Sequence, residues 1–271
     1  MIFRSRRRRN ESTGAAEDAA LDETGESVGE SQSLGSETPD RQAESETPDP
    51  ESSDKESAAP SLSELDAQDW RDLGPYDIFD VDIDALEDEI EAQSRIDLGS
   101  IIVNPMPDTE LRLQIDEDSQ QVVSAMMIRS DSALEVGAFA APRSGGLWAE
   151  IRDELVQGAH DAGGSADLVA GPFGVELRRL LPVRTPDGQD GYQPSRMWVA
   201  EGPRWMLRGI IYGQAALQTD LEGPVGEFLE AFRTIVVRRG DEAMAPGDLL
   251  PLSLPDNASP VAGAAGESGA T

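Results

Sequence analysis

The turn Arg143-Ser144-Gly145-Gly146, directly before a predicted helix, has residue types suited to ligand binding. Glycine lets backbone N–H groups approach a ligand closely, and a helix N-terminus favours an anion, to which Arg143 adds positive charge. The same four residues also suit a tight strand-to-helix turn in which Ser144 caps the helix. Both interpretations stay open at this point.

A second group of basic and aromatic residues lies on two neighbouring predicted strands. Arg204, Trp205 and Arg208 follow one turn, and Arg196 lies on the preceding strand. A row of guanidinium groups beside indole rings suits a phosphorylated or acidic peptide, including the acidic part of this chain. Alternatively, the row pairs with Glu176 and its neighbours across the sheet.

The sequence lacks a recognisable catalytic arrangement. Its single histidine, His160, falls at the C-terminal end of a predicted helix, where a charged imidazole favours the helix dipole. No nucleophile elbow, phosphate-binding loop or dinucleotide fingerprint occurs. The acidic run Asp116-Glu117-Asp118 is typical of a solvated turn, and the absence of cysteine removes thiolate nucleophiles and most zinc sites. We therefore expect no catalytic residue, no metal and no cofactor.

The elements that position these residues follow from hydrophobic periodicity. Apolar residues at helical spacing predict one helix around Trp148–Ala159 and another around Leu221–Ile235. Alternating patterns bounded by turn residues predict seven strands. These strands are Leu111–Ile115, Gln121–Ile128, Ala133–Ala141, Leu168–Ala170, Val175–Val183, Tyr192–Val199 and Trp205–Tyr212. The order predicts an α+β fold, with an antiparallel sheet of six to seven strands and both amphipathic helices on one face.

The acidic residues are concentrated in one part of the chain. Residues 10–98 hold 28 Asp and Glu against four Arg and Lys, whereas residues 99–240 hold 20 against 13. The acidic part also has few residues that could form a core. We therefore divide the chain into a disordered arm (1–68, a basic tip followed by acidic residues), a lead-in (69–98), an α+β core (99–240) and an extended tail (241–271).

The lead-in combines aromatic and acidic residues, and its residues Asp82–Ala92 have the apolar spacing of an amphipathic helix. Two interpretations remain. The segment either packs on the edge of the core or is a short linear motif that folds on a partner.

The arm contains two further features. Thr38 and Thr47 lie in a repeated Ser-Glu-Thr-Pro-Asp motif, which either reflects low-complexity drift or provides a pair of phosphorylation sites. The five arginines within Arg4–Arg9 could contact an anionic membrane surface, although the adjacent acidic stretch competes for them. No apolar stretch follows them, so they do not form an export signal, and a cytoplasmic location is expected. The net charge of −31 disfavours nucleic acid as a partner.

Six blocks of the sequence carry a resemblance to a known family. The blocks are Asp131–Leu134, Ala138–Trp148, Gly171–Gly174, Val183–Gly188, Gly202–Gly209 and Gly240–Pro246. They resemble an actinobacterial family catalogued as domain of unknown function 3710. The resemblance covers about residues 95–255, and it implies a cytoplasmic protein without an established activity. The order of elements is also similar to the Mog1/PsbP-like fold, a class of mostly non-catalytic binding domains.

We therefore expect a non-enzymatic protein-binding or adaptor domain that is regulated by its acidic arm, with another protein as partner. The alternative is a domain that binds a small molecule or anion, or an enzyme of unrecognised type, using the Arg143–Gly146 turn.

Overall fold

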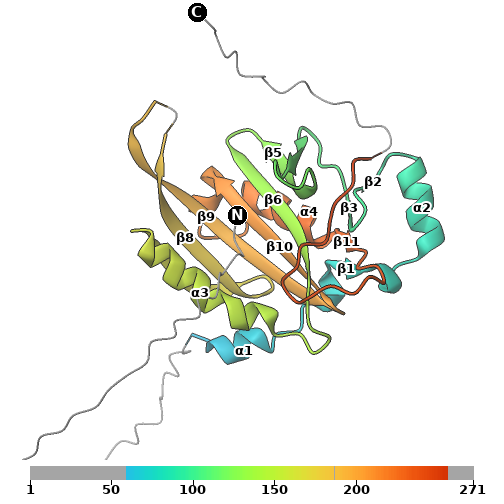
Figure 1. The fold of residues 1–271 in the computed structure, drawn as a ribbon, viewed down its shortest axis with the longest axis horizontal. Helices are drawn as coiled ribbons and strands as arrows, with labels where there is room; N and C mark the ends of the chain where they lie inside the picture. The colour runs from blue at the N-terminus through green and yellow to red at the C-terminus, as the bar shows by residue number, and fades with distance from the viewer. Residues whose placement is uncertain (1–58, 186, 256–271) are drawn as a thin grey trace, which may run out of the picture. The chain divides into compact units, whose positions relative to one another are not determined.

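The computed structural model of the chain describes residues 59–185 and 187–255, and its main element is a seven-stranded sheet (Figure 1). Every pair of neighbouring strands is antiparallel. The predicted α+β class and strand number are confirmed. In spatial order the strands are β4 (Glu110–Ile115), β5 (Val122–Arg129), β6 (Ser132–Ala140), β10 (Trp205–Gly213), β9 (Asp190–Gly202), β8 (Gly174–Arg184) and β7 (Ser165–Gly171).

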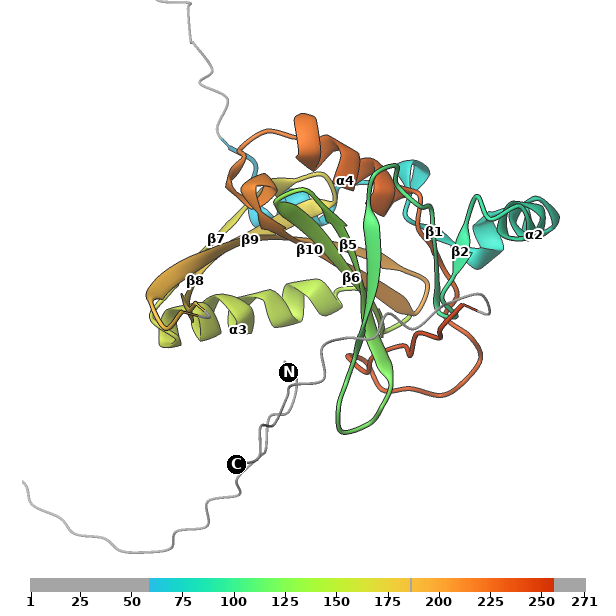
Figure 2. The same cartoon turned by 90° about the horizontal axis from the view of Figure 1, so that it is seen from above.

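The two predicted helices are present, but they cover opposite faces of the sheet (Figure 2). α3 (Leu147–Asp161) packs on the face that contains Met206 and Ile210, and α4 (Gly223–Arg233) packs on the face that contains Leu207. The prediction that both helices share one face is therefore wrong. The physical reason is that β10 is apolar at both odd and even positions, so each of its faces needs a covering layer.

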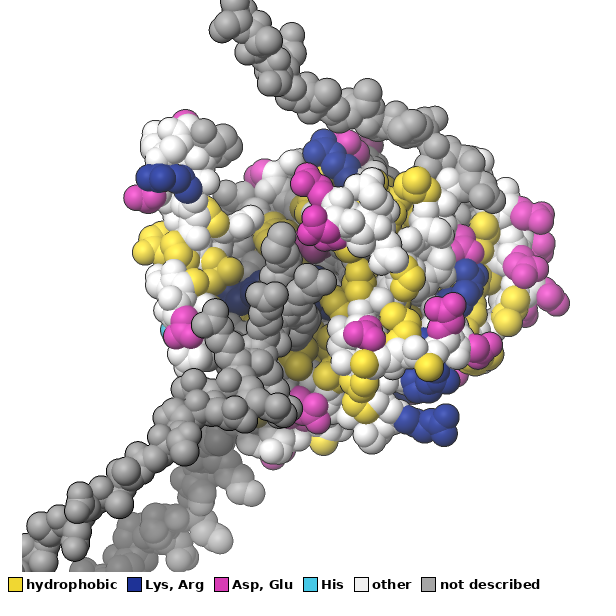
Figure 3. Space-filling view, viewed as in Figure 1, with side chains coloured by type: hydrophobic (Ala, Val, Ile, Leu, Met, Phe, Trp, Pro, Cys, Tyr) yellow, Lys and Arg dark blue, Asp and Glu magenta, His cyan; other side chains and the backbone are white. Residues whose placement is uncertain are grey.

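The lead-in forms part of a second, smaller sheet. Its four short strands, in the order β1-β11-β3-β2, are β1 (Tyr76–Asp77), β11 (Val236–Val237), β3 (Ile101–Val103) and β2 (Ile96–Asp97). The predicted helix is confirmed as α2 (Ile83–Glu91), and its Leu86 packs against Ile102 and Val236. Of the two interpretations of the lead-in, the structure therefore shows packing on the core. Acidic side chains cover the outer side of α2, at the right edge of Figure 3.

Residues 59–68, which the sequence analysis places in the disordered arm, also belong to the fold. They contain α1 (Leu62–Asp66), which begins with a capping box in which Ser61 and Glu64 satisfy each other's backbone N–H groups. Leu65, within α1, is its buried residue. The described residues also form three short 3-10 helices: η1 (Arg71–Leu73), η2 (Ile78–Asp80) and η3 (Gln214–Leu217).

The first part of the predicted tail lies along the sheet. Leu250 donates its backbone N–H to Ala138, Leu252 donates to Val122, and both leucine side chains are buried. The remainder of the tail, the basic tip Arg4–Arg9 and the motif residues Thr38 and Thr47 lie outside the described residues.

Candidate functional site

The turn before α3 is built around two glycines with left-handed backbone conformations. Gly145 has φ of 68° and Gly146 has φ of 87°, which a residue with a Cβ adopts only with strain. Gly146, and not Ser144, occupies the N-cap position, so the predicted serine cap is wrong. The Ser144 hydroxyl instead lies 3.5 Å from the carbonyl oxygen of Gly145.

The carboxylate of Glu201, at the end of β9, caps α3. It accepts hydrogen bonds from the backbone N–H groups of Gly146 at 3.0 Å, Leu147 at 2.8 Å and Trp148 at 3.3 Å. These are the donors that an anion at this helix terminus would use. The sequence pattern missed Glu201 because it lies more than 50 residues after the turn and gives no local signal.

A cleft of about 500 Å³ adjoins this turn. Residues 66–71 line one side, and residues 144–146 with the first turn of α3 line the other. The rings of Trp70, Trp148 and Phe173 contribute to its walls. Of the predicted ligand residues, Ser144, Gly145 and Gly146 border the cleft, whereas Arg143 is exposed and lies outside its lining.

The wall formed by residues 66–71 is attached to the core by two specific contacts. Asp66 accepts two hydrogen bonds from the guanidinium group of Arg152, at 2.5 and 2.8 Å, and this pairing raises the pKa of Arg152. Trp70 meets Phe173 edge to face, with ring centroids 5.7 Å apart. A charge pair and an aromatic pair therefore set the width of the cleft.

The second predicted site does not form as a row. Arg196 points to the α4 face of the sheet, Arg208 points to the α3 face, and Arg204 lies in the turn between β9 and β10. Trp205 is fully buried, and its indole N–H donates to Asp77 at 2.6 Å. Whether any of these residues contacts a ligand stays a prediction.

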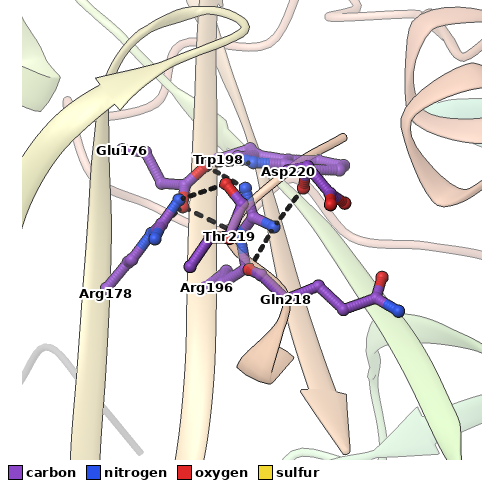
Figure 4. A network of polar contacts seen from close by, with 7 residues as sticks. All are labelled: Glu176, Arg178, Arg196, Trp198, Gln218, Thr219 and Asp220. Carbon is purple, nitrogen blue, oxygen red and sulfur yellow. Dashed lines mark hydrogen bonds and ion pairs between the residues drawn. The ribbon is translucent and has the colours of Figure 1, made fainter. Parts of the chain in front are cut away.

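Arg196 is bound within a buried polar network (Figure 4). Its guanidinium group donates to Glu176 at 2.8 and 3.0 Å, and also to the carbonyl oxygens of Gln218 and Asp220 at 3.0 Å each. Glu176 also accepts from the indole of Trp198 at 2.7 Å and from Arg178 at 2.7 Å. The network therefore holds the loop after η3 against the sheet. The side chain of Arg196 is only 1% exposed.

Arg208 belongs to a different cluster, on the α3 face. Its guanidinium group lies over the ring of Phe139 at 4.9 Å and 3.6 Å from Glu135. The carboxylate of Glu135 accepts a hydrogen bond from the hydroxyl group of Tyr212, with 3.0 Å between the two oxygen atoms. Arg179 of β8, which was not among the predicted contact residues, contributes positive charge to the same cluster. Burial lowers the pKa of Arg179 and Arg208 and, with Glu135, raises that of Tyr212.

The remaining candidates have ordinary surroundings. His160 is exposed near the end of α3, and the carboxylate of Asp116 accepts two hydrogen bonds from Ser119 within its own turn. Between residues 59 and 255, Pro186 aside, no three or more His, Asp or Glu residues are grouped as metal ligands. None of the helices in that part of the chain has the length and apolar character needed to cross a membrane.

The fold and the site together define an α+β domain in which one antiparallel sheet is covered by a helix on each face. The chain belongs to the family described as "Protein of unknown function (DUF3710)", whose model matches residues 74–260. The actinobacterial origin and the likeness to the Mog1/PsbP-like fold stay predictions.

No curated protein matches the sequence. Among solved structures, a crystal structure of a protein from Bacteroides thetaiotaomicron is similar over 51% of this chain, with 17% sequence identity and a TM-score of 0.31. The chain spans 45% of the length of that protein.

Proposed function

We propose that this protein is a non-enzymatic protein-binding domain of the adaptor type, that its cleft receives a side chain of the partner, and that the acidic arm regulates this binding. The observation that carries the proposal is that the carboxylates at the cleft already have internal partners. Glu201 caps α3, and Asp66 binds Arg152. A catalytic base or nucleophile must instead be free to exchange a proton or attack a substrate.

The composition of the cleft favours a cationic side chain of the partner. Its lining combines Trp70, Trp148 and Phe173 with three acidic residues and one basic residue, Arg71. Asp66 is paired with Arg152, whereas Asp69 and Glu201 accept hydrogen bonds from backbone N–H groups and have no ion-pair partner within the described residues. Arg71 already pairs with Asp80 at 3.0 Å. Aromatic rings together with carboxylates suit a lysine or arginine side chain, which gains both cation–π and charge interactions.

Site-specific photo-crosslinking in the native cell tests this function. A photoreactive residue in place of Ser144, at the cleft, should give a discrete adduct with another protein. The same residue in place of Ala162, at the opposite end of α3, is the matched control and should not. Ala149→Trp, which fills the cleft from its α3 side, should reduce the adduct formed at position 144. Equal adducts at both positions, or no adduct at position 144, would overturn the proposal.

Regulation by the arm is tested in the full-length chain. Replacing the Asp and Glu residues of 10–58 with Asn and Gln removes 15 negative charges without changing chain length. Because the arm is acidic, it should compete with the cleft carboxylates for a cationic partner, so the neutral arm should increase adduct formation at position 144. An unchanged yield counts against regulation and leaves the cleft proposal intact.

The alternative function, an anion site at Arg143–Gly146, is disfavoured by Glu201. Its carboxylate already occupies the N–H groups of the helix terminus, and a second negative charge there is repelled. The cytoplasmic location stays a prediction.

A further inference from the structure

A cluster on the α3 face brings together two arginines from strands that are not adjacent. Arg179 of β8 pairs with Ser195 of β9, which in turn pairs with Tyr212 of β10, so Arg179 and Tyr212 lie in one row across the sheet. Arg208 lies four residues before Tyr212 on the same strand and therefore on the same face. The register thus directs both guanidinium groups to the middle of this face.

Arg208 lies beside the neighbouring strand β6. It pairs with Gly137, and its guanidinium group lies over the ring of Phe139, two residues further along that strand. Figure 3 looks onto this face. The neighbouring apolar side chains include Met197 and Ile210.

The charges within the cluster do not balance. Arg179 and Arg208 carry two positive charges, and Glu135 supplies one negative charge, which it shares between Arg208 and the hydroxyl of Tyr212. In the described part of the chain, Arg179 makes no ion pair within 4.0 Å, and Nε of Arg179 and of Arg208 has no hydrogen-bond partner. Arg179 is nevertheless only 9% exposed. Buried donors without an acceptor are costly, so the cluster is one acceptor group short.

The buried Glu176 network on the other face provides a comparison within the same protein. There the carboxylate is bound by Arg178, Arg196 and Trp198, and Arg196 also reaches two backbone carbonyl oxygens. The sheet is therefore able to satisfy a buried arginine fully. Burial lowers the pKa of Arg179 and Arg208, because removing a guanidinium group from water disfavours its charged form, and Glu135 offsets this only in part.

We propose that Arg179 and Arg208 together bind the carboxylate of an apolar ligand on the α3 face of the sheet. One carboxylate supplies the missing negative charge and an acceptor group for the two guanidinium groups. A phosphate dianion brings more charge than the cluster lacks. The apolar side chains next to the cluster that stay partly exposed, Ala166, Leu168 and Tyr212, receive the rest of the ligand. This site is separate from the cleft beside Glu201, so either proposal can fail without the other.

The test follows the Nε–Hε NMR signals of the arginines in the full-length protein, with hexanoate as the probe. Hexanoate should shift the signals of Arg179 and Arg208, whereas hexanamide, of the same shape but uncharged, should not. Inorganic phosphate at equal concentration should give a weaker response. Equal responses to hexanoate and hexanamide, or none to hexanoate, overturn the proposal.

Substitutions then locate the site. Arg208→Met and Arg179→Met should each weaken hexanoate binding by roughly tenfold, since each removes a charged hydrogen bond. Arg184→Met is the matched control, because Arg184 lies on the same strand as Arg179 but its side chain is 76% exposed. If Arg184→Met weakens hexanoate binding as much as Arg179→Met does, the assignment of the site to Arg179 and Arg208 is contradicted. The measurements on the unmodified chain stand even if a variant fails to fold.

Discussion

Several carboxylates in this protein accept hydrogen bonds from donors that are distant in the sequence, and three of them show the same role. Asp77 binds the indole of Trp205, Glu176 binds the indole of Trp198 together with Arg196, and Glu201 caps α3. In each case one acidic side chain joins two elements that hydrophobic packing alone would leave free to shift. These carboxylates therefore specify how elements are placed.

The cap formed by Glu201 leads to a prediction about anions. Glu201→Ala exposes the N–H groups of Gly146 and Leu147, so the variant should lose about 1 kcal/mol of stability. It should also gain phosphate binding, seen as shifts of these two amide signals in NMR spectra. The unmodified protein should show no such shifts. If phosphate shifts these amide signals in the unmodified protein, the turn binds anions, and the carboxylate of Glu201 does not occupy its N–H groups.

The Glu176 network predicts a strongly non-additive pair of substitutions. Glu176→Gln leaves the buried Arg196 without a counter-charge and should destabilise the protein by about 3–5 kcal/mol in chemical denaturation. Arg196→Met should then cost less in the Glu176→Gln background than alone, because the unpaired charge has been removed. Glu110→Gln is the control, since Glu110 and Arg112 form an exposed pair, and this change should leave the denaturation midpoint nearly unaltered.

At the scale of single elements, α1 is short and depends on its cap. The hydrogen bonds from the backbone and side chain of Ser61 lower the pKa of Glu64. A lowered pKa in the folded state means that the cap contributes stability at pH values above the ordinary pKa of Glu. This contribution is lost as the pH falls through the lower, folded-state pKa.

The pH prediction is tested by NMR titration of the Glu64 carboxyl group. The pKa of Glu64 should lie below that of an ordinary glutamate, and Ser61→Ala should raise it towards the ordinary value because the donors are lost or weakened. Ser63→Ala is the control, because Ser63 lies two residues after Ser61 and makes no hydrogen bond to Glu64 in the described structure, so it should leave the pKa of Glu64 unchanged. An unaltered pKa in Ser61→Ala contradicts the capping box.

The elements themselves are largely predictable from the sequence. Alternation gives all seven strands of the main sheet, and helical spacing gives α2, α3 and α4, because burial of one face imposes these periods. The hydrophobic periodicity of a helix does not determine which face of the sheet the helix covers. It depends on the path of the connections and on β10 being apolar on both sides.

The candidate sites were less predictable, for reasons of register. The two-residue turn Pro203-Arg204 pairs Trp205 with Gly202, so even-numbered residues of β9 share a face with odd-numbered residues of β10. Arg196 and Arg208 therefore point in opposite directions, although both have even numbers. The same register brings Arg179 into line with Tyr212. Predicting these partners requires the pairing of three strands, which residue spacing within one strand does not supply.

At the scale of the whole molecule, segments from both ends of the described chain complete the core. Leu65 lies near its beginning and Leu250 near its end, and both are buried. β1 pairs with β11, which follows α4, so residues 76–77 and 236–237 stabilise each other. The predicted core of residues 99–240 therefore lacks apolar contacts that the folded protein contains, since Leu250 and Leu252 pack within the main core cluster.

The contribution of the C-terminal segment can be measured with two leucines of the same stretch. Leu250 is 1% exposed and Leu254 is 58% exposed. Leu250→Ala creates a cavity beside the sheet and should lower the free energy of unfolding by about 2–5 kcal/mol. Leu254→Ala removes the same atoms from a largely solvated position and should change it by less than about 0.5 kcal/mol. Equal effects in chemical denaturation, whether large or small, contradict the packing of this segment as part of the core.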